Sequence, residues 1–376
     1  MICCFYLNNR LSGSNFRCIF GLYRIHYRIT NRSLSFHKLL IMPSRNFKAP
    51  PITTNPAGGE RSVGYEFEFT GVEMEDVAEV ISSLYGGKVK KISTYVIEVQ
   101  ETDFGTFTLE LDAQLLRDKK YEKSLKSIGV DISRFKNIES IEGALKDMAS
   151  SIVPFEIITP PIKLSKMAEL NRLLDELRKW KAKGTGSSMF YAFGLHINPE
   201  ISDDSTQSLL NHMRAYMLLD PWIRRDADIN MSRRITPYIN EYQDGYKSLL
   251  FSSGYNPSLR ELISDYFTYG NSRNRPLDML PLFMHVDKEH TSALLEDTLT
   301  SSRPTYHYRL PNCSIEDPDW KLADEWNRWV LVEKLAEDER SLKQYAKAYL
   351  KMKRETMIGF EAKWIKLMDR WVNNVS

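Results

Sequence analysis

Cysteine is scarce in the body of this 376-residue chain. Three of the four cysteines, Cys3, Cys4 and Cys18, lie near the N-terminus, and only Cys313 lies in the remainder. A single cysteine excludes a disulfide framework for the folded part. A reducing compartment is therefore expected, and we predict a cytoplasmic protein.

Acidic residues are absent from the start of the chain, since Glu60 is the first of them. Residues 1–41 carry six arginines and lysines, so the net charge of +2 hides a basic start and an acidic remainder. Such a segment is typical of a targeting peptide, or it precedes a translation start at Met42. We favour the start at Met42, because residues 1–41 show no sustained apolar helical face. The prolines and paired glycines of residues 43–62 predict an unstructured lead-in.

Long apolar runs and the common nucleotide-binding signatures are missing as well. No stretch approaches the roughly eighteen apolar residues of a membrane span, and we expect no membrane or nucleic-acid partner. The chain has no Walker A loop, no Gly-x-Gly-x-x-Gly turn, no His-Glu-x-x-His and no Gly-x-Ser-x-Gly. A phosphate site would therefore depend on other groups. Arginine is the best candidate, because its planar fork makes bidentate contacts to phosphate.

Residues 63–69 alternate strictly between large apolar side chains and small or acidic ones. This period predicts a half-buried strand with Tyr65, Phe67 and Phe69 facing a core. Glu66 and Glu68 would then share the opposite face, about 6.6 Å apart along the strand. Like charges at this spacing repel unless a cation or water lies between them, and Mg²⁺ accepts such carboxylate ligands. Taken alone, the pair is more typical of a solvated strand face.

Four later segments, residues 106–112, 155–159, 189–198 and 305–310, repeat this arrangement. If these strands share one sheet, its polar face carries Glu66, Glu68, Glu110, Asp112, Glu156, His196, His307 and Arg309. Carboxylates and imidazoles are ligands of divalent metals. Taken singly, His196 is more typical of a histidine satisfied by a backbone carbonyl, and Glu156 of an ion pair with an arginine. The set as a whole favours a metal-binding face.

Short strands and inserted helices without regular βαβ alternation predict an α+β fold. We expect a mainly antiparallel sheet, with helices packed on the face opposite the polar one. The expected helices span 75–84, 138–150, 165–182, 203–219, 257–269 and 277–284, and one strand spans 88–100. From Trp320 onward two helices carry five of the seven tryptophans. We interpret these as packing residues that anchor a helical tail, rather than as a groove or partner surface.

The domain organisation follows from these elements. We predict a disordered or wrongly assigned extension over residues 1–59, a catalytic domain over residues 60–318 and a helical segment over residues 319–376.

The motifs at residues 64–69, 156–161, 194–198 and 308–311 resemble, in this order, those of the putative amidoligase family. That family belongs to the carboxylate–amine ligase superfamily, with glutamine synthetase and glutamate–cysteine ligase. The resemblance implies an antiparallel sheet that forms a funnel-like site for ATP and for Mg²⁺ or Mn²⁺. It also implies that ATP phosphorylates a carboxylate and that an amine then attacks the acyl phosphate to give an amide. The substrates would be amino acids or peptides.

The resemblance also implies roles for individual residues. The expected metal ligands are Glu66, Glu68, Glu156, His196 and His307, although Glu156 could instead hold a substrate ammonium and His196 could contact phosphate. The expected catalytic residues are Glu68 and Arg309, with Arg309 stabilising the transferred phosphoryl group. Independently of the resemblance, we expect Asp112, Arg225, Arg234, Arg303 and Arg309 as nucleotide ligands, although any one of these arginines except Arg309 is more typical of a surface ion pair. Two departures leave the number of metals open: His307 replaces a frequent carboxylate, and Asn198 replaces a frequent second histidine.

Two other classes of function stay open at this point. A metal-dependent hydrolase could use the same carboxylates to activate water, although the chain lacks a histidine-rich zinc cage. A binding protein with a relict site is the other alternative, and the retention of every acidic motif residue argues against it.

Overall fold

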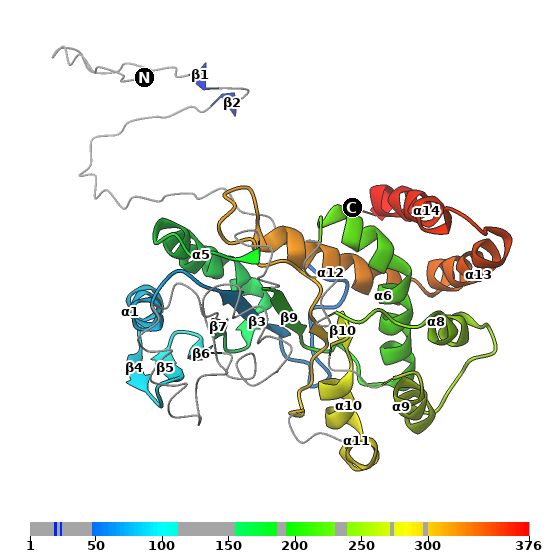
Figure 1. Cartoon of the computed structure of the whole chain (residues 1–376), viewed down its shortest axis with the longest axis horizontal. Coiled ribbons are helices and arrows are strands. Elements are labelled where there is room, and N and C mark those ends of the chain that lie inside the picture. The colour runs from blue at the N-terminus through cyan, green and yellow to red at the C-terminus, as the bar shows by residue number, and fades with distance from the viewer. Residues whose placement is uncertain are drawn as a thin grey trace, which may run out of the picture. The chain divides into compact units, whose positions relative to one another are not determined.

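The computed structural model describes residues 47–111, 155–185, 193–229, 239–270, 274–295 and 300–375, together with two short strands near the N-terminus (Figure 1). It divides into Met1–Pro43 and Ser44–Ser376. In the first unit, strand β1 (Ile19–Phe20) pairs antiparallel with β2 (Tyr23–Arg24). Asp112, Arg234 and the helix predicted at 138–150 lie outside the described residues.

Within the described part of the second unit, one nine-stranded sheet dominates. Its strands are β3 (Ser62–Phe69), β4 (Lys88–Lys91), β5 (Val96–Thr102), β6 (Gly105–Leu111), β7 (Phe155–Ile158), β8 (Ile162–Lys163), β9 (Leu195–Pro199), β10 (Leu277–Asp278) and β11 (His307–Tyr308). Their order is β10-β11-β9-β3-β7-β6-β5-β4, with β8 also paired to β3, and every pair is antiparallel. The predicted α+β class with an antiparallel sheet is confirmed.

The apolar face of the sheet is buried under helices. Tyr65, Phe67 and Phe69 are fully buried, as their alternation predicts. Helix α1 (Met74–Tyr85) lies over β6, where the ring of Tyr85 stacks on that of Phe107. Helix α5 (Leu170–Lys179) packs beside α1 and continues a 3₁₀ turn, η2 (Leu164–Glu169).

Toward β9 and β11, helices α6 (Thr206–Asp226) and α12 (Leu322–Glu337) cover the same apolar face. The α6 residue His212 stacks on Tyr306, and the α12 residue Trp329 packs against the rings of Tyr306 and Tyr308. The remaining helices are α8 (Asp244–Phe251), α9 (Leu259–Thr268), α10 (Leu280–Val286), α11 (Lys288–Leu294), α13 (Glu339–Glu355) and α14 (Phe360–Val375). None of the helices in the described residues is both long enough and apolar enough to cross a bilayer.

The C-terminal tail holds three helices rather than the expected two. The side chain of Asp338 accepts a hydrogen bond from the Ser341 N–H and so separates α12 from α13. The packing interpretation of the tryptophans is confirmed: Trp326, Trp329 and Trp364 are fully buried.

Two other expectations are wrong for local reasons. The single strand predicted over residues 88–100 is the hairpin of β4 and β5, because a turn at Ser93 reverses the chain. The helix predicted from residue 277 begins only at Leu280, because Leu277 and Asp278 extend the sheet as β10. Pairing with β11 therefore overrides the helical pattern at the start of this segment.

Residues 47–61, in the segment predicted as a lead-in, form no helix or named strand, but hydrogen bonds hold part of this segment in place. The Lys48 backbone N–H donates to Asn327 Oδ1 at 2.8 Å, and Trp326 Nε1 donates to the Lys48 carbonyl at 2.9 Å. Both partners lie on α12, so residues near 48 are held against the C-terminal part of the chain.

A buried ion pair joins the start of β3 to α12. Arg61 Nη2 and Nη1 donate to the two carboxylate oxygens of Glu333 at 2.7 and 2.8 Å, and both residues are at most 2% exposed. The guanidinium also donates to the carbonyls of Ile52 and Glu200 at 2.6 and 2.7 Å. Trp329 Nε1 donates to the same carboxylate at 2.6 Å. One side chain thus links the lead-in segment, the sheet and the tail.

Glu333→Gln is expected to lower the free energy of unfolding by about 3 kcal/mol or more, because it leaves the buried Arg61 guanidinium without its counter-charge. Urea unfolding followed by circular dichroism measures this change. Glu339→Gln is the matched control. Glu339 and Lys343 form an exposed ion pair within α13, and exposed pairs contribute little to stability. Equal stability of the two variants would contradict the role given to Arg61.

Candidate active site

The register of β3 brings the predicted polar residues together. Glu66 lies directly opposite His196 of β9, and Glu68 lies directly opposite Glu156 of β7. Glu110 of β6 is in turn opposite Glu156. Because cross-strand partners share a face of the sheet, these side chains all project from the face opposite the buried core.

Glu66 lies at the centre of the cluster. Its Oε1 accepts hydrogen bonds from Asn198 Nδ2 at 2.9 Å and from Arg303 Nη1 at 3.0 Å. Its Oε2 lies 2.6 Å from His196 Nδ1. Burial alone would raise the pKa of this carboxyl, but the contacts with His196 and His307 outweigh burial and hold the pKa well below its usual range. Glu66 is therefore ionised.

His196 lies between two carboxylates. Burial and the nearby positive charge of Arg309 lower the pKa of its imidazole to about 3, so the ring is neutral at physiological pH. A neutral imidazole donates one hydrogen bond only. The short contact of Nδ1 with the ionised Glu66 places the proton on Nδ1. The lone pair of Nε2 then faces Glu68 Oε1 at 3.3 Å.

Two electron-pair donors at this distance repel each other unless a proton or a cation lies between them. The other oxygen of Glu68 is held by the Gly194 N–H at 2.6 Å, which fixes the carboxylate in this orientation. This geometry fits a divalent cation held by the imidazole and the carboxylate.

His307 of β11 completes the cluster. The pKa of its ring depends on Asp278, a residue that the sequence analysis did not identify. Its Nδ1 lies 3.4 Å from Asp278 Oδ2, and its Nε2 lies 3.8 Å from Glu66 Oε2. Burial lowers the pKa of His307, but the carboxylates of Asp278 and Glu66 outweigh burial and raise it above its ordinary value. Asp278 is 2% exposed, and its Oδ1 accepts the Leu280 N–H at 3.0 Å.

Among the residues that the structure describes, two groups of side chains could hold a metal ion. The first is Glu66, His196 and His307, and the second is Glu68, Glu156 and His196; within each group the ligand atoms all lie within 4.8 Å of one another. The rings of His196 and His307 are 5.2 Å apart between centroids. Because neutral His196 has one lone pair, it can serve only one group, and the tautomer above assigns it to Glu68 and Glu156.

The arginines divide into two sets. Arg303 reaches Glu66, so its guanidinium lies at the cluster. The charge of Arg309 helps to lower the pKa of His196 and opposes the net rise in the pKa of His307, so Arg309 lies close to both rings. Arg225 does not lie there. It is on α6, which covers the opposite face of the sheet, and its Nη1 donates to Asp369 Oδ2 of α14 at 2.8 Å. An ion pair between helices thus accounts for Arg225.

Comparison with known proteins places this cluster in a family. No curated protein and no solved structure matches the chain. The family model described as putative amidoligase enzyme matches residues 59–331, which is more than half of the chain and includes every strand that contributes to the cluster. The resemblance carried by the four strand motifs is thereby confirmed, and the chain belongs to the family of putative amidoligase enzymes.

Proposed function

We propose that this protein is an ATP-dependent carboxylate–amine ligase whose active site is the polar face around β3. The observation that carries the proposal is the position of neutral His196, with a lone pair directed at the carboxylate of Glu68. Family membership supports a ligase, and the arginines at the cluster support a phosphorylated intermediate. The substrates would be an amino acid or peptide carboxylate and an amine.

The donor set fits Mg²⁺ or Mn²⁺. Glu68, Glu156 and His196 Nε2 would hold one cation, and Glu66 with His307 Nε2 would contribute to a second. Carboxylates suit Mg²⁺ and Mn²⁺, and the imidazoles favour Mn²⁺ further. Such cations supply charge that neutralises the phosphates of ATP.

The reaction requires two displacements. An oxygen of the substrate carboxylate attacks the γ-phosphorus of ATP, and ADP leaves with the bonding electrons, which gives an acyl phosphate. The amine nitrogen then attacks the acyl carbon, inorganic phosphate leaves, and the nitrogen loses a proton to give the amide. Arg309 and Arg303 would hold the phosphoryl oxygens during the first step, because guanidinium groups match their geometry and charge.

Incubation of the protein with ATP, Mg²⁺ or Mn²⁺ and a pool of amino acids tests this function. A ligase releases ADP only when a carboxylate and an amine are both present, and mass spectrometry then detects the amide. Amide hydrolysis without ATP would favour the metal-dependent hydrolase instead. The absence of both reactions would favour a binding protein.

Glu68→Gln is expected to abolish ATP turnover and to weaken Mn²⁺ binding about tenfold or more, because it removes a charged ligand beside His196. Stability should hold or rise, since the substitution also relieves repulsion with Glu156 across the strand pair. Calorimetric titration with Mn²⁺ and an ADP-release assay measure the two effects. Glu79→Gln, at an exposed position on α1, is the control. Unchanged Mn²⁺ affinity in Glu68→Gln would refute the metal assignment.

Arg309→Lys is expected to lower kcat about 10²-fold or more while changing the KM for ATP little. Lysine keeps the charge but loses the planar fork, and the lost contact is one that strengthens in the transition state. Steady-state kinetics with varied ATP separates the two constants. A higher KM with unchanged kcat would make Arg309 a ground-state nucleotide contact.

Asp278→Asn is expected to lower the pKa of His307, because it removes one of the two carboxylates that raise it. The asparagine oxygen can still accept the Leu280 N–H, so the fold should be kept. A pH titration of the histidine rings by ¹H–¹⁵N NMR, with His307→Gln to assign the signal, measures the change without any metal. Asp265→Asn, at a carboxylate that binds the Tyr255 hydroxyl, is the control. An unchanged His307 titration would show that Asp278 does not act on that ring.

A further inference from the structure

A cavity of about 740 Å³ lies between α6, α8 and α13. Its apolar wall is formed by Phe251, Leu342, Ala346 and Leu350. Because α6 covers the apolar face of the sheet, this cavity is separate from the cluster around Glu66. Figure 1 shows α6 between the sheet strands and the pair α8 and α13.

A partly buried arginine, Arg214, lines this cavity, and its hydrogen-bond partners among the described residues are backbone carbonyls. Arg214 Nε donates to the Leu250 carbonyl at 2.6 Å, and Nη2 donates to the Tyr255 carbonyl at 2.9 Å. Burial lowers the pKa of this guanidinium, and no described carboxylate lies near enough to offset the effect of burial. Partial burial removes some of the water around this guanidinium, and the two carbonyl dipoles replace only part of that hydration.

The other charges at the cavity have the same sign. Lys343, Lys347 and Arg354 of α13 all line it. Of the lining residues only Glu339 is acidic, and Lys343 Nζ binds its carboxylate at 2.6 Å. Among the described lining residues, Arg214 and the exposed Lys347 and Arg354 therefore leave the cavity with an excess of positive charge.

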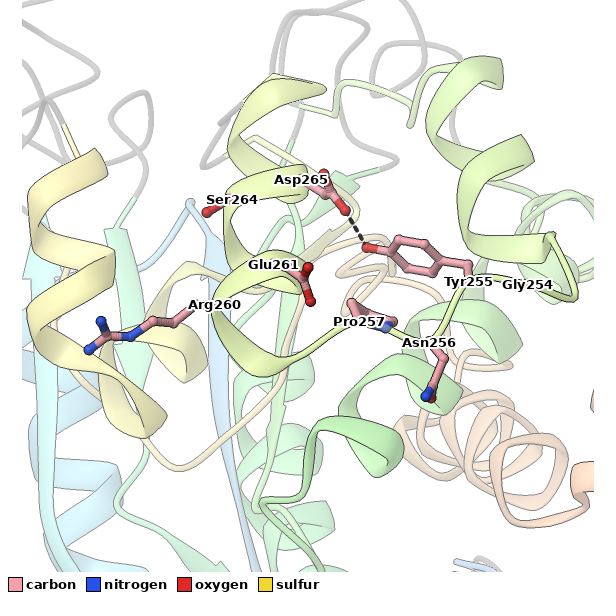
Figure 2. Close-up of a pocket in the computed structure, with 8 residues that line it drawn as sticks. All are labelled: Gly254, Tyr255, Asn256, Pro257, Arg260, Glu261, Ser264 and Asp265. Atoms are coloured by element: carbon pink, nitrogen blue, oxygen red, sulfur yellow. Dashed lines mark hydrogen bonds between the residues drawn. The ribbon is translucent and has the colours of Figure 1, made fainter.

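In a neighbouring hollow, by contrast, the arginine is paired with a carboxylate. This hollow has a volume of about 420 Å³ and shares Tyr255 and Asn256 with the larger cavity. Figure 2 shows the Tyr255 hydroxyl donating to Asp265, while Arg260 points away from both. Arg260 Nε binds Asp287 Oδ2 at 3.0 Å, so the cation of this hollow is neutralised. Within the described part of the chain, the excess of positive over negative lining residues thus distinguishes the larger cavity.

We propose that the cavity between α6, α8 and α13 binds a small molecule with an anionic head, a carboxylate or a phosphate monoester, and an apolar body. The head would contact Arg214 and Lys347, and the body would lie against Phe251, Leu342 and Leu350. The volume is in the range of ordinary small-molecule sites. This site does not depend on the proposed ligase activity.

Calorimetric titration of the full-length protein with four probes tests the chemistry. Octanoate and octyl phosphate carry the two candidate heads, octanol keeps the apolar body without charge, and inorganic phosphate keeps the charge alone. We expect one equivalent of octanoate or octyl phosphate to bind, about tenfold or more tighter than octanol or inorganic phosphate. The tighter of the two octyl anions identifies the head. Equal binding of octanol, or no binding of either octyl anion, would overturn the proposal.

Matched variants locate the bound probe. Lys347→Glu is expected to weaken binding of the octyl anion about tenfold or more, because it reverses a charge at the cavity. Lys351→Glu is the control, since Lys351 lies one turn further along α13, exposed and outside the lining. Ala346→Leu fills part of the cavity and leaves all its cations in place, so it should also weaken binding. Unchanged affinity in both Lys347→Glu and Ala346→Leu would place the ligand elsewhere and refute the site.

Discussion

The pairing of β3 with β7 on one side and β9 on the other is the constraint on which this structure depends. Its register sets Glu66 against His196 and Glu68 against Glu156. A shift of one residue would turn the carboxylates into the core and the aromatic residues out to the polar face. The buried aromatic side chains of β3 make that shift very costly, so the apolar face fixes the geometry of the polar one.

Sequence periodicity could predict the part of the site that lies on strands long enough to show an alternation. Glu66, Glu68, Glu156 and His196 all belong to such strands, and the structure brings them together on one face. Asp278 could not be found in this way, because β10 has two residues and its sequence continues into a helical pattern. The strand exists only through its pairing with β11. Likewise, nothing local in the sequence links Arg225 to Asp369, which are joined by helix packing.

The buried and partly buried charged groups of the chain differ in whether the protein itself supplies all their partners. Arg61 and Glu333 satisfy each other, and the remaining donors of the guanidinium meet carbonyls, so this buried pair is complete within the protein. At His196 and at Arg214 the pairing is incomplete among the described residues. The Nε2 lone pair of His196 faces the carboxylate of Glu68, and the guanidinium of Arg214 meets only backbone carbonyls. Incomplete pairing inside a folded protein marks positions where a ligand can supply the missing charge.

The distance along the chain between interacting residues also bears on how the protein folds. Glu66 meets His196 from 130 positions away and Arg303 from 237, and Arg61 meets Glu333 from 272. Contacts of such long range form only after large loops close, and they slow folding. During synthesis β3 would emerge long before its partners β9 and α12. Until then β3 would leave both its unpaired backbone edges and its aromatic face exposed, and such exposure favours aggregation of a nascent chain.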